Sequence, residues 1–215
     1  MRFDPMRFDP SVYVIADRAF GRCRPLEDLV TAAVAGGATM VQLREKKWSA
    51  GRVVEAGRRL LEITRRAGVP LIVNDRADIA LAVGADGVHL GPDDLPVGDA
   101  RLLLGPEKII GASAATVEEA LAAQAEGANY VGVGSVFPTG SKPDAGQAIG
   151  IEPLTRIKAA VGIAVVAIGG ITHANAALAV RAGADGVAVI SAVIGADDVA
   201  GATRRLMEAV RAARG

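Results

Sequence analysis

The sequence predicts a single (β/α)8 barrel, in which eight parallel strands alternate with helices. Short apolar runs alternate with longer amphipathic runs along nearly the whole chain. Short strands that are apolar on both faces are typical of a parallel sheet covered by helices. A chain of 215 residues is at the small end for this fold, which spans about 200 to 400 residues. The strands are expected at Val12–Ala16, Met40–Arg44, Leu71–Asn74, Gly87–Leu90, Lys108–Ala112, Tyr130–Val133, Ala164–Ile168 and Gly186–Ile190.

Amphipathic runs with helix boundary signals follow these strands. Pro96 and Pro153 lie at helix starts, where the missing N–H costs no hydrogen bond. Ser49 and Thr116 are suited to N-cap positions, and Thr116 has Glu119 three residues on, as in a capping box. The helices are expected at Pro25–Ala35, Ser49–Ala67, Arg76–Val83, Val97–Leu104, Thr116–Glu126, Glu152–Ala160, His173–Ala182 and Asp198–Ala213.

A short repeat marks the junctions from helix to strand. It occurs at Gly84–Val88, Gly127–Val131 and Gly183–Val187, with a weaker copy at Gly37–Val41. Its first glycine can end a helix in the left-handed conformation, and the apolar residues then begin the next strand. An open doubly wound sheet is the alternative fold. No Gly-x-Gly-x-x-Gly turn follows the first strand, where Ala16–Phe20 stands instead, so the barrel is favoured.

Composition limits the classes of function. The 24 basic and 24 acidic residues balance, so neither a nucleic-acid nor a membrane partner is expected, and the expected partners are small molecules. No apolar run reaches the ~18 residues of a membrane span, and the start lacks the apolar core of a secretory signal. The single cysteine, Cys23, excludes an internal disulfide and suits a reducing compartment. We expect a cytoplasmic location; the sequence carries no signal of oligomeric state.

The chain begins with the pentapeptide Met-Arg-Phe-Asp-Pro written twice, at Met1–Pro5 and Met6–Pro10. Five residues are too few to form a packing unit, so this is not a structural repeat. The expected organisation is therefore a duplicated pentapeptide over residues 1–10 outside the fold, and one barrel domain over residues 11–215.

Polar residues gather at the carboxyl ends of the predicted strands, where barrels of this class place their active sites. Gln42, Arg44 and Lys46 point to one face if the second strand extends through Lys46, although a solvated strand end would look the same. Asp75 and Asp94 follow the next two strands and could share one Mg²⁺ ion. The alternatives are a helix cap at Asp75 and a turn residue at Asp94.

Two separate anion sites are indicated. Gly169-Gly170 and Ile190-Ser191 end the last two strands, where such barrels often bind a phosphate through backbone N–H groups; glycines that serve only a tight turn are the alternative. Lys142 lies in a Gly- and Pro-containing loop over residues 138–150, of a length typical of a lid. An ordinary exposed lysine is the alternative there. With the two cations of the second strand, Lys142 would suit a diphosphate bound with a metal.

Other chemistry-bearing residues give weaker signals. His89 lies inside an apolar run and is expected to be a packed core histidine, while His173 begins a predicted helix. Trp48 is expected to pack in the loop after the second strand. No Ser/His/Asp arrangement and no paired cysteines stand out.

Five motifs lie at strand ends in chain order: Gln42–Lys46, Asn74–Arg76, Gly87–Asp94, Val136–Lys142 and Ala167–Ile171. Together they resemble the thiamine-phosphate synthase family, from about residue 13 to residue 194. The resemblance implies a (β/α)8 barrel that transfers an alkyl group, joining a hydroxymethylpyrimidine diphosphate to a thiazole phosphate. The products would be thiamine phosphate and diphosphate, and Mg²⁺ would assist the loss of diphosphate.

The resemblance also implies roles for individual residues. Asp75 and Asp94 would bind Mg²⁺, and catalysis would rest on Arg44, Lys46 and Lys142 together with Ser113. Ser141 departs mildly from the family, which often has a threonine there. The pyrimidine diphosphate would contact Gln42, Leu43, Arg44, Glu45, Lys46, Asn74, Ser113 and Lys142, and the thiazole phosphate would contact Thr139, Gly140, Ser141, Gly170, Ile190 and Ser191.

The implied chemistry needs no protein nucleophile and no strong base, because it stabilises a leaving group and positions a second reactant. A thiazole tautomerase on the same barrel would need the monophosphate site but neither the carboxylates nor the diphosphate cations. A non-catalytic protein that binds thiamine precursors would tolerate loss of the carboxylate pair. A sugar-phosphate isomerase would need an acid/base pair at strand ends. The joint presence of the carboxylates and cations favours the synthase.

Overall fold

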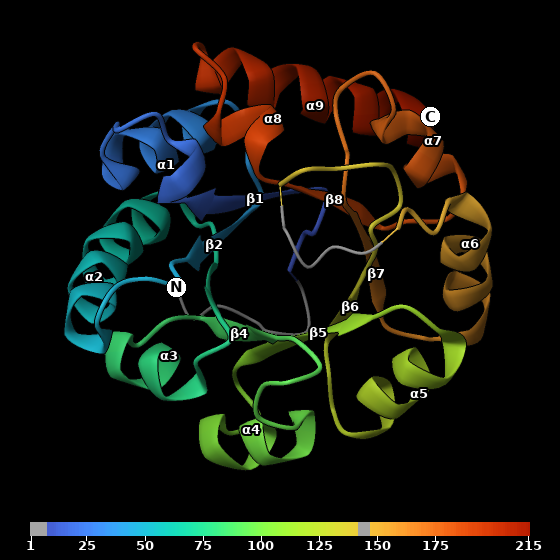
Figure 1. Ribbon diagram of the computed structural model, residues 1–215, viewed down its shortest axis with the longest axis horizontal. Helices are drawn as coiled ribbons and strands as arrows, with labels where there is room; N and C mark the ends of the chain where they lie inside the picture. Colours follow the sequence, from blue (N-terminus) through green and yellow to red (C-terminus); the bar gives the residue numbers. More distant parts are fainter. Residues whose placement is uncertain (1–7, 142–146) are drawn as a thin grey trace.

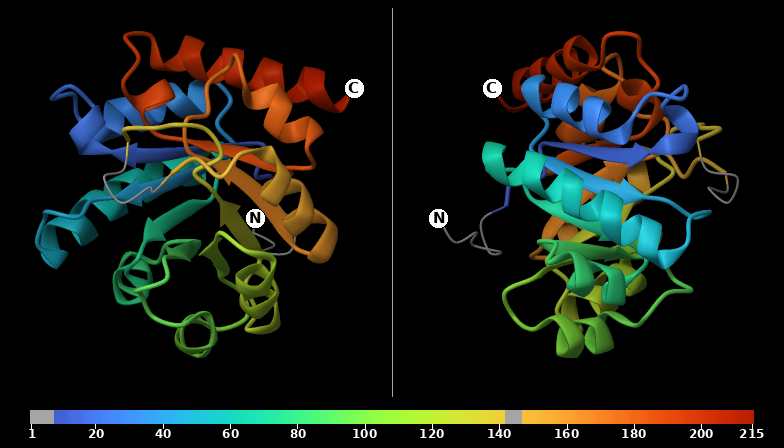
Figure 2. Two further views of the ribbon diagram at one scale, coloured as in Figure 1. Left: turned by 45° about the vertical axis from the view of Figure 1, so that its right-hand side comes forward. Right: turned by 90° about the vertical axis from the view of Figure 1, so that its left-hand side faces the viewer.

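The computed structural model describes residues 8–141 and 147–215. These residues form a closed barrel of parallel strands, each paired with its neighbours in chain order, and β1 closes the ring with β8 (Figure 1). Figure 2 shows from the side that the strands run in one direction. The predicted (β/α)8 barrel is confirmed. The strands are β1 Val12–Asp17, β2 Met40–Arg44, β3 Leu71–Asn74, β4 Gly87–Leu90, β5 Ile109–Ala114, β6 Tyr130–Val133, β7 Ala164–Ile168 and β8 Gly186–Val189.

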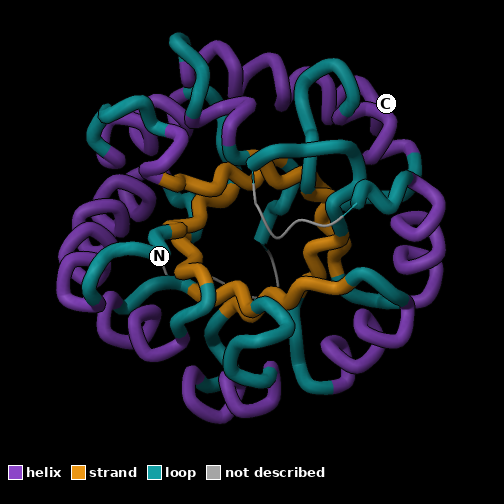
Figure 3. Tube along the Cα trace, in the orientation of Figure 1, coloured by secondary structure: helices purple, strands orange, loops and turns teal. Residues whose placement is uncertain are grey.

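Helices surround the strand ring on the outside (Figure 3). Thr116 and Glu119 form the predicted capping box, and Ser49 is an N-cap residue without a side-chain hydrogen bond. The helices are η1 Arg18–Phe20, α1 Leu26–Ala35, α2 Ala50–Ala67, α3 Ala77–Val83, α4 Val97–Leu104, α5 Val117–Ala125, α6 Ile151–Ala160, α7 Ala176–Arg181, α8 Ser191–Ile194 and α9 Val199–Arg214.

Most predicted boundaries agree with the structure to within one residue; larger differences occur at β5 and α7, and two short helices are additional. The fifth strand runs to Ala114, so Ser113 lies within β5 rather than after it. Helix α7 begins at Ala176, not His173, because the Thr172 N–H bonds the Asn175 side chain and a turn comes first. The short helices η1 and α8 were not predicted, since three or four residues carry no readable period.

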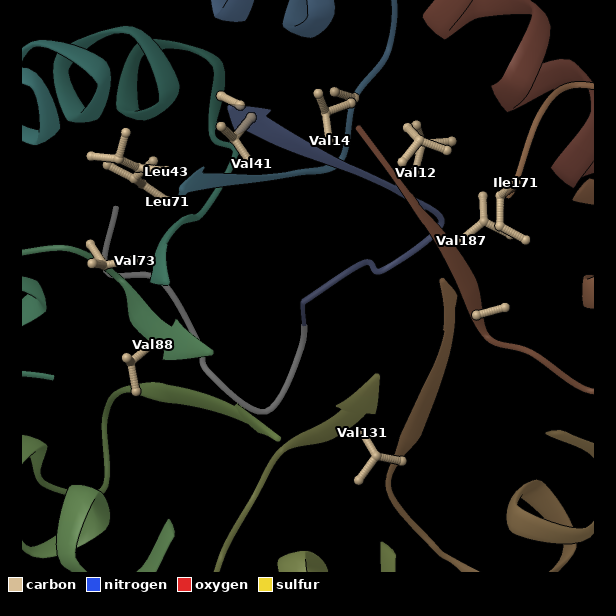
Figure 4. Packing of buried hydrophobic residues seen from close by; sticks show 14 of the residues in the cluster. Val12, Val14, Val41, Leu43, Leu71, Val73, Val88, Val131, Ile171 and Val187 are labelled. Carbon is tan, nitrogen blue, oxygen red and sulfur yellow. The ribbon is translucent and has the colours of Figure 1, made fainter. Parts of the chain in front are cut away.

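Side chains alternate between the barrel interior and the layer under the helices. Tyr13 and Met40 belong to the interior cluster. Val14, Val41 and Leu43 belong to the larger cluster between the strands and the helices (Figure 4). Burial on both faces explains why the strands are apolar throughout. The same alternation decides which strand-end residues reach the mouth of the barrel.

The junction repeat serves a second purpose at the amino end of the barrel. Its first glycine has a positive φ in all four copies, as expected for a helix end. Its third residue accepts a hydrogen bond from a backbone N–H near the start of the preceding strand. We name these contacts the amino-end clasps. They join Thr39 Oγ1 to Val12 N at 2.9 Å, Asp86 Oδ2 to Leu71 N at 2.8 Å, Asn129 Oδ1 to Ile110 N at 2.8 Å, and Asp185 Oδ2 to Val165 N at 2.7 Å.

Packing extends to residues before the first strand. The rings of Phe8 and Tyr130 lie 5.8 Å apart between centroids. Phe8 also packs against the interior cluster. The expected domain boundary at residue 11 stays a prediction, but Phe8, in the second pentapeptide, makes contact with the barrel.

Candidate active site

A cleft of about 1260 Å³ opens at the carboxyl ends of the strands. Ligand sites commonly measure about 300–1,000 Å³, so this cleft has room for two small reactants. Strands and loops from around the barrel contribute to it, and it brings together most of the predicted site residues. Its lining includes Arg44, Lys46, Asn74, Asp75, Asp94, Ser113, Thr139, Gly140, Ser141, Gly170, Ile190 and Ser191.

The predicted residues of the second strand alternate between the two faces, and of Gln42, Leu43 and Arg44 only Arg44 lines the cleft. Strand β2 ends at Arg44, as predicted, so the strand alternation does not extend to Lys46. Gln42 does point inward with Arg44, but it is 2% exposed and its Nε2 donates to Tyr13 Oη at 2.7 Å. Leu43 packs under the helices, so any substrate contact there uses its backbone. Glu45 is held by its own loop, where Oε1 accepts from Lys47 N at 2.9 Å.

Arg44 is fixed by an ion pair that the sequence reasoning missed. Its Nη1 donates to Oδ2 of Asp17, which is 5% exposed at the end of β1. The other carboxylate oxygen of Asp17 accepts from Ala19 N at 2.9 Å, which anchors it in turn. Asp17 and Arg44 are register partners on the adjacent strands β1 and β2, and the opposite charges at the ends of two consecutive predicted strands could have indicated the pair. Arg44 therefore faces the cleft in one defined position.

Asp75 and Asp94 lie together on the same side of the cleft. Burial and the neighbouring Asp94 carboxylate raise the pKa of Asp75, and Lys46 opposes this with its Nζ 3.5 Å from Asp75 Oδ2. The N-cap position of α3 belongs to Arg76, so the helix-cap alternative for Asp75 is wrong. Asp94 does accept from Gly91 N at 2.7 Å, so it closes a turn and faces Asp75 at once.

This carboxylate pair fits a hard divalent cation. Two like charges side by side are unfavourable without a counter-charge. Mg²⁺ typically binds one or two protein carboxylates and takes its remaining oxygen ligands from water and phosphate. Over residues 8–141 and 147–215, no group of three or more His, Cys, Asp or Glu side chains gathers as a metal site. The Asp75–Asp94 pair is nevertheless sufficient for the kind of site that Mg²⁺ uses with a phosphate ligand.

The opposite side of the cleft offers hydroxyl and backbone groups. Ser141 and Ser191, fifty residues apart in the chain, meet with their Oγ atoms at 2.9 Å. Ser141 N also donates to Thr139 Oγ1 at 3.1 Å. Gly170 has φ +65°, and a Cβ there would lie 2.5 Å from the Pro138 carbonyl oxygen, so only glycine fits. This side is suited to binding a phosphate without a metal.

The other predicted residues of interest are one lysine, two histidines and the tryptophan. Lys142 lies outside the described residues. His89 is 9% exposed and, as expected, packs in the barrel, between the side chains of Tyr130 and Ser113. His173 is exposed before α7. Trp48 packs in its loop beneath Arg52, whose guanidinium carbon is 4.6 Å from the ring centroid.

Fold and cleft together define a (β/α)8-barrel enzyme with a carboxylate- and cation-bearing half and a hydroxyl-bearing half. A family model described as thiamine monophosphate synthase matches residues 12–193. The thiamine-phosphate synthase of Moorella thermoacetica is 59% identical over 204 residues, covering 95% of this chain and 97% of that protein. That of a Roseiflexus species is 54% identical over 213 residues, covering 98% and 90%.

A solved structure agrees with these sequence relatives. The thiamine phosphate pyrophosphorylase from Pyrococcus furiosus superposes with a TM-score of 0.89 at 46% identity, covering 96% of this chain and 98% of that one. The chain therefore belongs to the thiamine-phosphate synthase family, as its motifs predict. In the part of the chain that the structure describes, no helix has the length and apolarity to cross a membrane.

Proposed function

We propose that this enzyme joins a hydroxymethylpyrimidine diphosphate to a thiazole phosphate, producing thiamine phosphate and diphosphate. Membership of the thiamine-phosphate synthase family supports this reaction. The observation that carries the assignment of the site is the two-sided cleft. Asp75, Asp94, Arg44 and Lys46 line one part of it, and Ser141 with Ser191 lines another. One diphosphate and one monophosphate reactant would use both parts.

The diphosphate end is assigned to the carboxylate and cation side. Arg44 and Lys46 would bind the diphosphate oxygens, with Asn74 and Ser113 as neutral hydrogen-bonding partners. Asp75 and Asp94 would hold Mg²⁺, which when bound neutralises charge on the diphosphate and makes it a better leaving group. The sequence assigns Lys142 to the same group, and its part stays a prediction because it lies outside the described residues.

The proposed step breaks one bond and forms another. The bond between the pyrimidine methylene carbon and the diphosphate oxygen breaks, and its electron pair leaves with the diphosphate. The lone pair of the thiazole nitrogen then forms the new carbon–nitrogen bond to the resulting cation. Arg44, fixed by Asp17, and Lys46 stabilise charge that grows on the departing oxygen, and no protein base has to remove a proton.

The thiazole phosphate is assigned to Thr139, Gly140, Ser141, Gly170, Ile190 and Ser191. The close approach of Gly170 to the loop at Pro138 supports this, because it brings that loop next to the end of β7. The cytoplasmic location stays a prediction from composition, as does the absence of a nucleic-acid partner.

Coupling of the two reactants tests the proposal. The protein is incubated with the pyrimidine diphosphate, the thiazole phosphate and Mg²⁺, and thiamine phosphate is measured. We expect product with Mg²⁺, none after chelation with EDTA, and recovery when Mg²⁺ is restored. Ser191→Ala is expected to raise KM for the thiazole phosphate and leave KM for the pyrimidine diphosphate unchanged. Binding of both compounds without any product would refute the synthase assignment in favour of a binding protein.

A further inference from the structure

A continuous chain of hydrogen bonds crosses the barrel interior beneath the cleft. It links five side chains from five strands and ends at Ser113, which lines the cleft. Gln42 Nε2 donates to Tyr13 Oη at 2.7 Å, and Tyr13 Oη lies 2.9 Å from Tyr130 Oη. Tyr130 Oη lies 3.0 Å from His89 Nδ1, and His89 Nε2 lies 3.1 Å from Ser113 Oγ. The Gln42 end is buried, and the Ser113 end is exposed.

Two inward-facing strand glycines make room for this chain. A Cβ on Gly111 would lie 2.0 Å from the Tyr130 ring. A Cβ on Gly132 would lie 3.1 Å from His89 Cε1. The Tyr130 and His89 rings stack at 5.5 Å with an interplanar angle of 23°. The backbone is thus shaped around the two central rings of the chain, which holds their polar atoms in place.

The direction of each hydrogen bond follows from counting hydrogens. Burial raises the pKa of Tyr13 and of Tyr130, so each phenol keeps its one hydrogen. Because the Gln42 amide donates to Tyr13, the Tyr13 hydrogen is directed to Tyr130. The Tyr130 hydrogen is then directed to His89 Nδ1, which must be the ring nitrogen without hydrogen. The remaining hydrogen of the ring is on Nε2, which donates to Ser113 Oγ.

We propose that this ordered chain fixes Ser113 as a hydrogen-bond donor toward the cleft. Ser113 Oγ accepts from His89, so its own hydroxyl hydrogen is free to point at a ligand acceptor. Under the proposed function, on which this assignment of the ligand rests, the acceptor is an anionic oxygen of the pyrimidine diphosphate. His89, Tyr130 and Tyr13 are positioning residues that act through Ser113. The reverse order would present a lone pair of Ser113 to that anion and weaken binding.

The tautomer of His89 is the first test, and it needs no substrate. The chain has two histidines, His89 and His173, so a His173→Gln variant assigns both in a protein labelled with ¹⁵N-histidine. Long-range proton–nitrogen correlation spectra distinguish the ring nitrogens. We expect His89 to be neutral with its hydrogen on Nε2. A hydrogen on Nδ1, or on both nitrogens, would overturn the proposed order.

A double-mutant cycle tests whether Tyr130 acts through Ser113. Tyr130→Phe keeps the ring and removes only the hydroxyl. We expect it to lower kcat/KM for the pyrimidine diphosphate by about tenfold, as for the loss of one hydrogen bond to a charged group. KM for the thiazole phosphate should change less than about twofold. In a Ser113→Ala background, Tyr130→Phe should have almost no further effect. Equal losses in both backgrounds would refute the coupling.

Conservative rescue separates positioning from packing. A His89→Gln side chain offers both a carbonyl acceptor and an amide donor, whereas His89→Leu offers neither. We expect His89→Gln to retain several-fold more activity than His89→Leu, and equal activities would count against the proposal. Thr64→Val is the matched control, because it removes a buried hydroxyl in α2 that bonds Leu61 O; its kinetics should equal those of the wild type.

The two tests also separate this inference from the proposed function. If no thiamine phosphate forms, the proposed reaction is wrong, yet the tautomer of His89 still decides the order of the chain. If thiamine phosphate forms and His89 carries its hydrogen on Nδ1, only the ordered chain is wrong.

Discussion

The two ends of this barrel use the same kind of residue in opposite ways. At the amino end, each clasp carboxylate or amide accepts a backbone N–H, and Asp185 is further paired with Lys158 Nζ at 2.6 Å. At the carboxyl end, Asp75 and Asp94 face each other, and the pKa of Asp75 is raised by burial and by that neighbour. The acidic groups at the amino end thus have partners that offset their charge or satisfy their oxygens, whereas at the carboxyl end two carboxylates share one nearby lysine, Lys46.

The largest expected effect comes from the carboxyl end. Asp75→Asn and Asp94→Asn should each lower the rate of thiamine phosphate formation by about 10²-fold or more, since each weakens the same proposed Mg²⁺ site. The double variant should be little worse than either single variant. The rates are measured over a range of Mg²⁺ concentrations. Losses that multiply would instead indicate separate structural roles.

Asp94→Asn should lower the rate but should not lower the thermal stability of the protein. The raised pKa of Asp75 means that the folded state binds its proton more tightly than the unfolded state, so ionisation of Asp75 lowers stability as pH rises above its unfolded pKa. Asp94→Asn removes the neighbouring charge and keeps an oxygen that can accept from Gly91. In EDTA at neutral pH, we expect its Tm to be equal to or above that of the wild type. A clearly lower Tm would show that the pair stabilises the fold.

The next largest effect is on stability and comes from the amino end. Asp86→Ala leaves the Leu71 N–H without its acceptor and should lower the free energy of unfolding by about 1–3 kcal/mol. Urea denaturation measures this, and kcat per folded molecule should stay unchanged.

Asp86→Asn is the matched control, because asparagine already stands at this repeat position as Asn129 and accepts in the same way. It should lose much less stability than Asp86→Ala. Similar losses in the two variants would mean that the clasp hydrogen bond contributes little.

An effect of similar size is expected at the start of the chain. Phe8→Ala removes the ring that packs on Tyr130 and should lower the free energy of unfolding by about 1–3 kcal/mol, less than for a fully buried phenylalanine because Phe8 is partly exposed. Thermal and urea denaturation give the size. No change would show that the contact is not formed in solution.

The smallest effect is expected from deletion of residues 1–5. The remaining chain keeps the second pentapeptide and therefore keeps Phe8. Tm and turnover should equal those of the full chain within error. A large drop in Tm would show that the first pentapeptide contributes to packing.

Much of the fold was predictable because its signals are local. A two-residue period at Gln42 and Arg44, a glycine at each junction and the capping box at Thr116 all depend on neighbours within a few positions. The position of the Lys46 side chain was not predictable in this way. Lys46 continues the alternation in sequence, but β2 ends at Arg44 and Lys46 lies near Asp75 instead.

The sequence by itself determined the barrel, the order of its elements and many of the polar residues that line its mouth, since hydrophobic periodicity and the side of a strand are properties of the local chain. Tertiary structure decided which of these residues meet. The Asp17–Arg44 pair, the Ser141–Ser191 contact and the chain from Gln42 to Ser113 join residues far apart in sequence. Such contacts depend on the closure and register of the whole barrel, because hydrogen bonds require atoms within about 3 Å of each other.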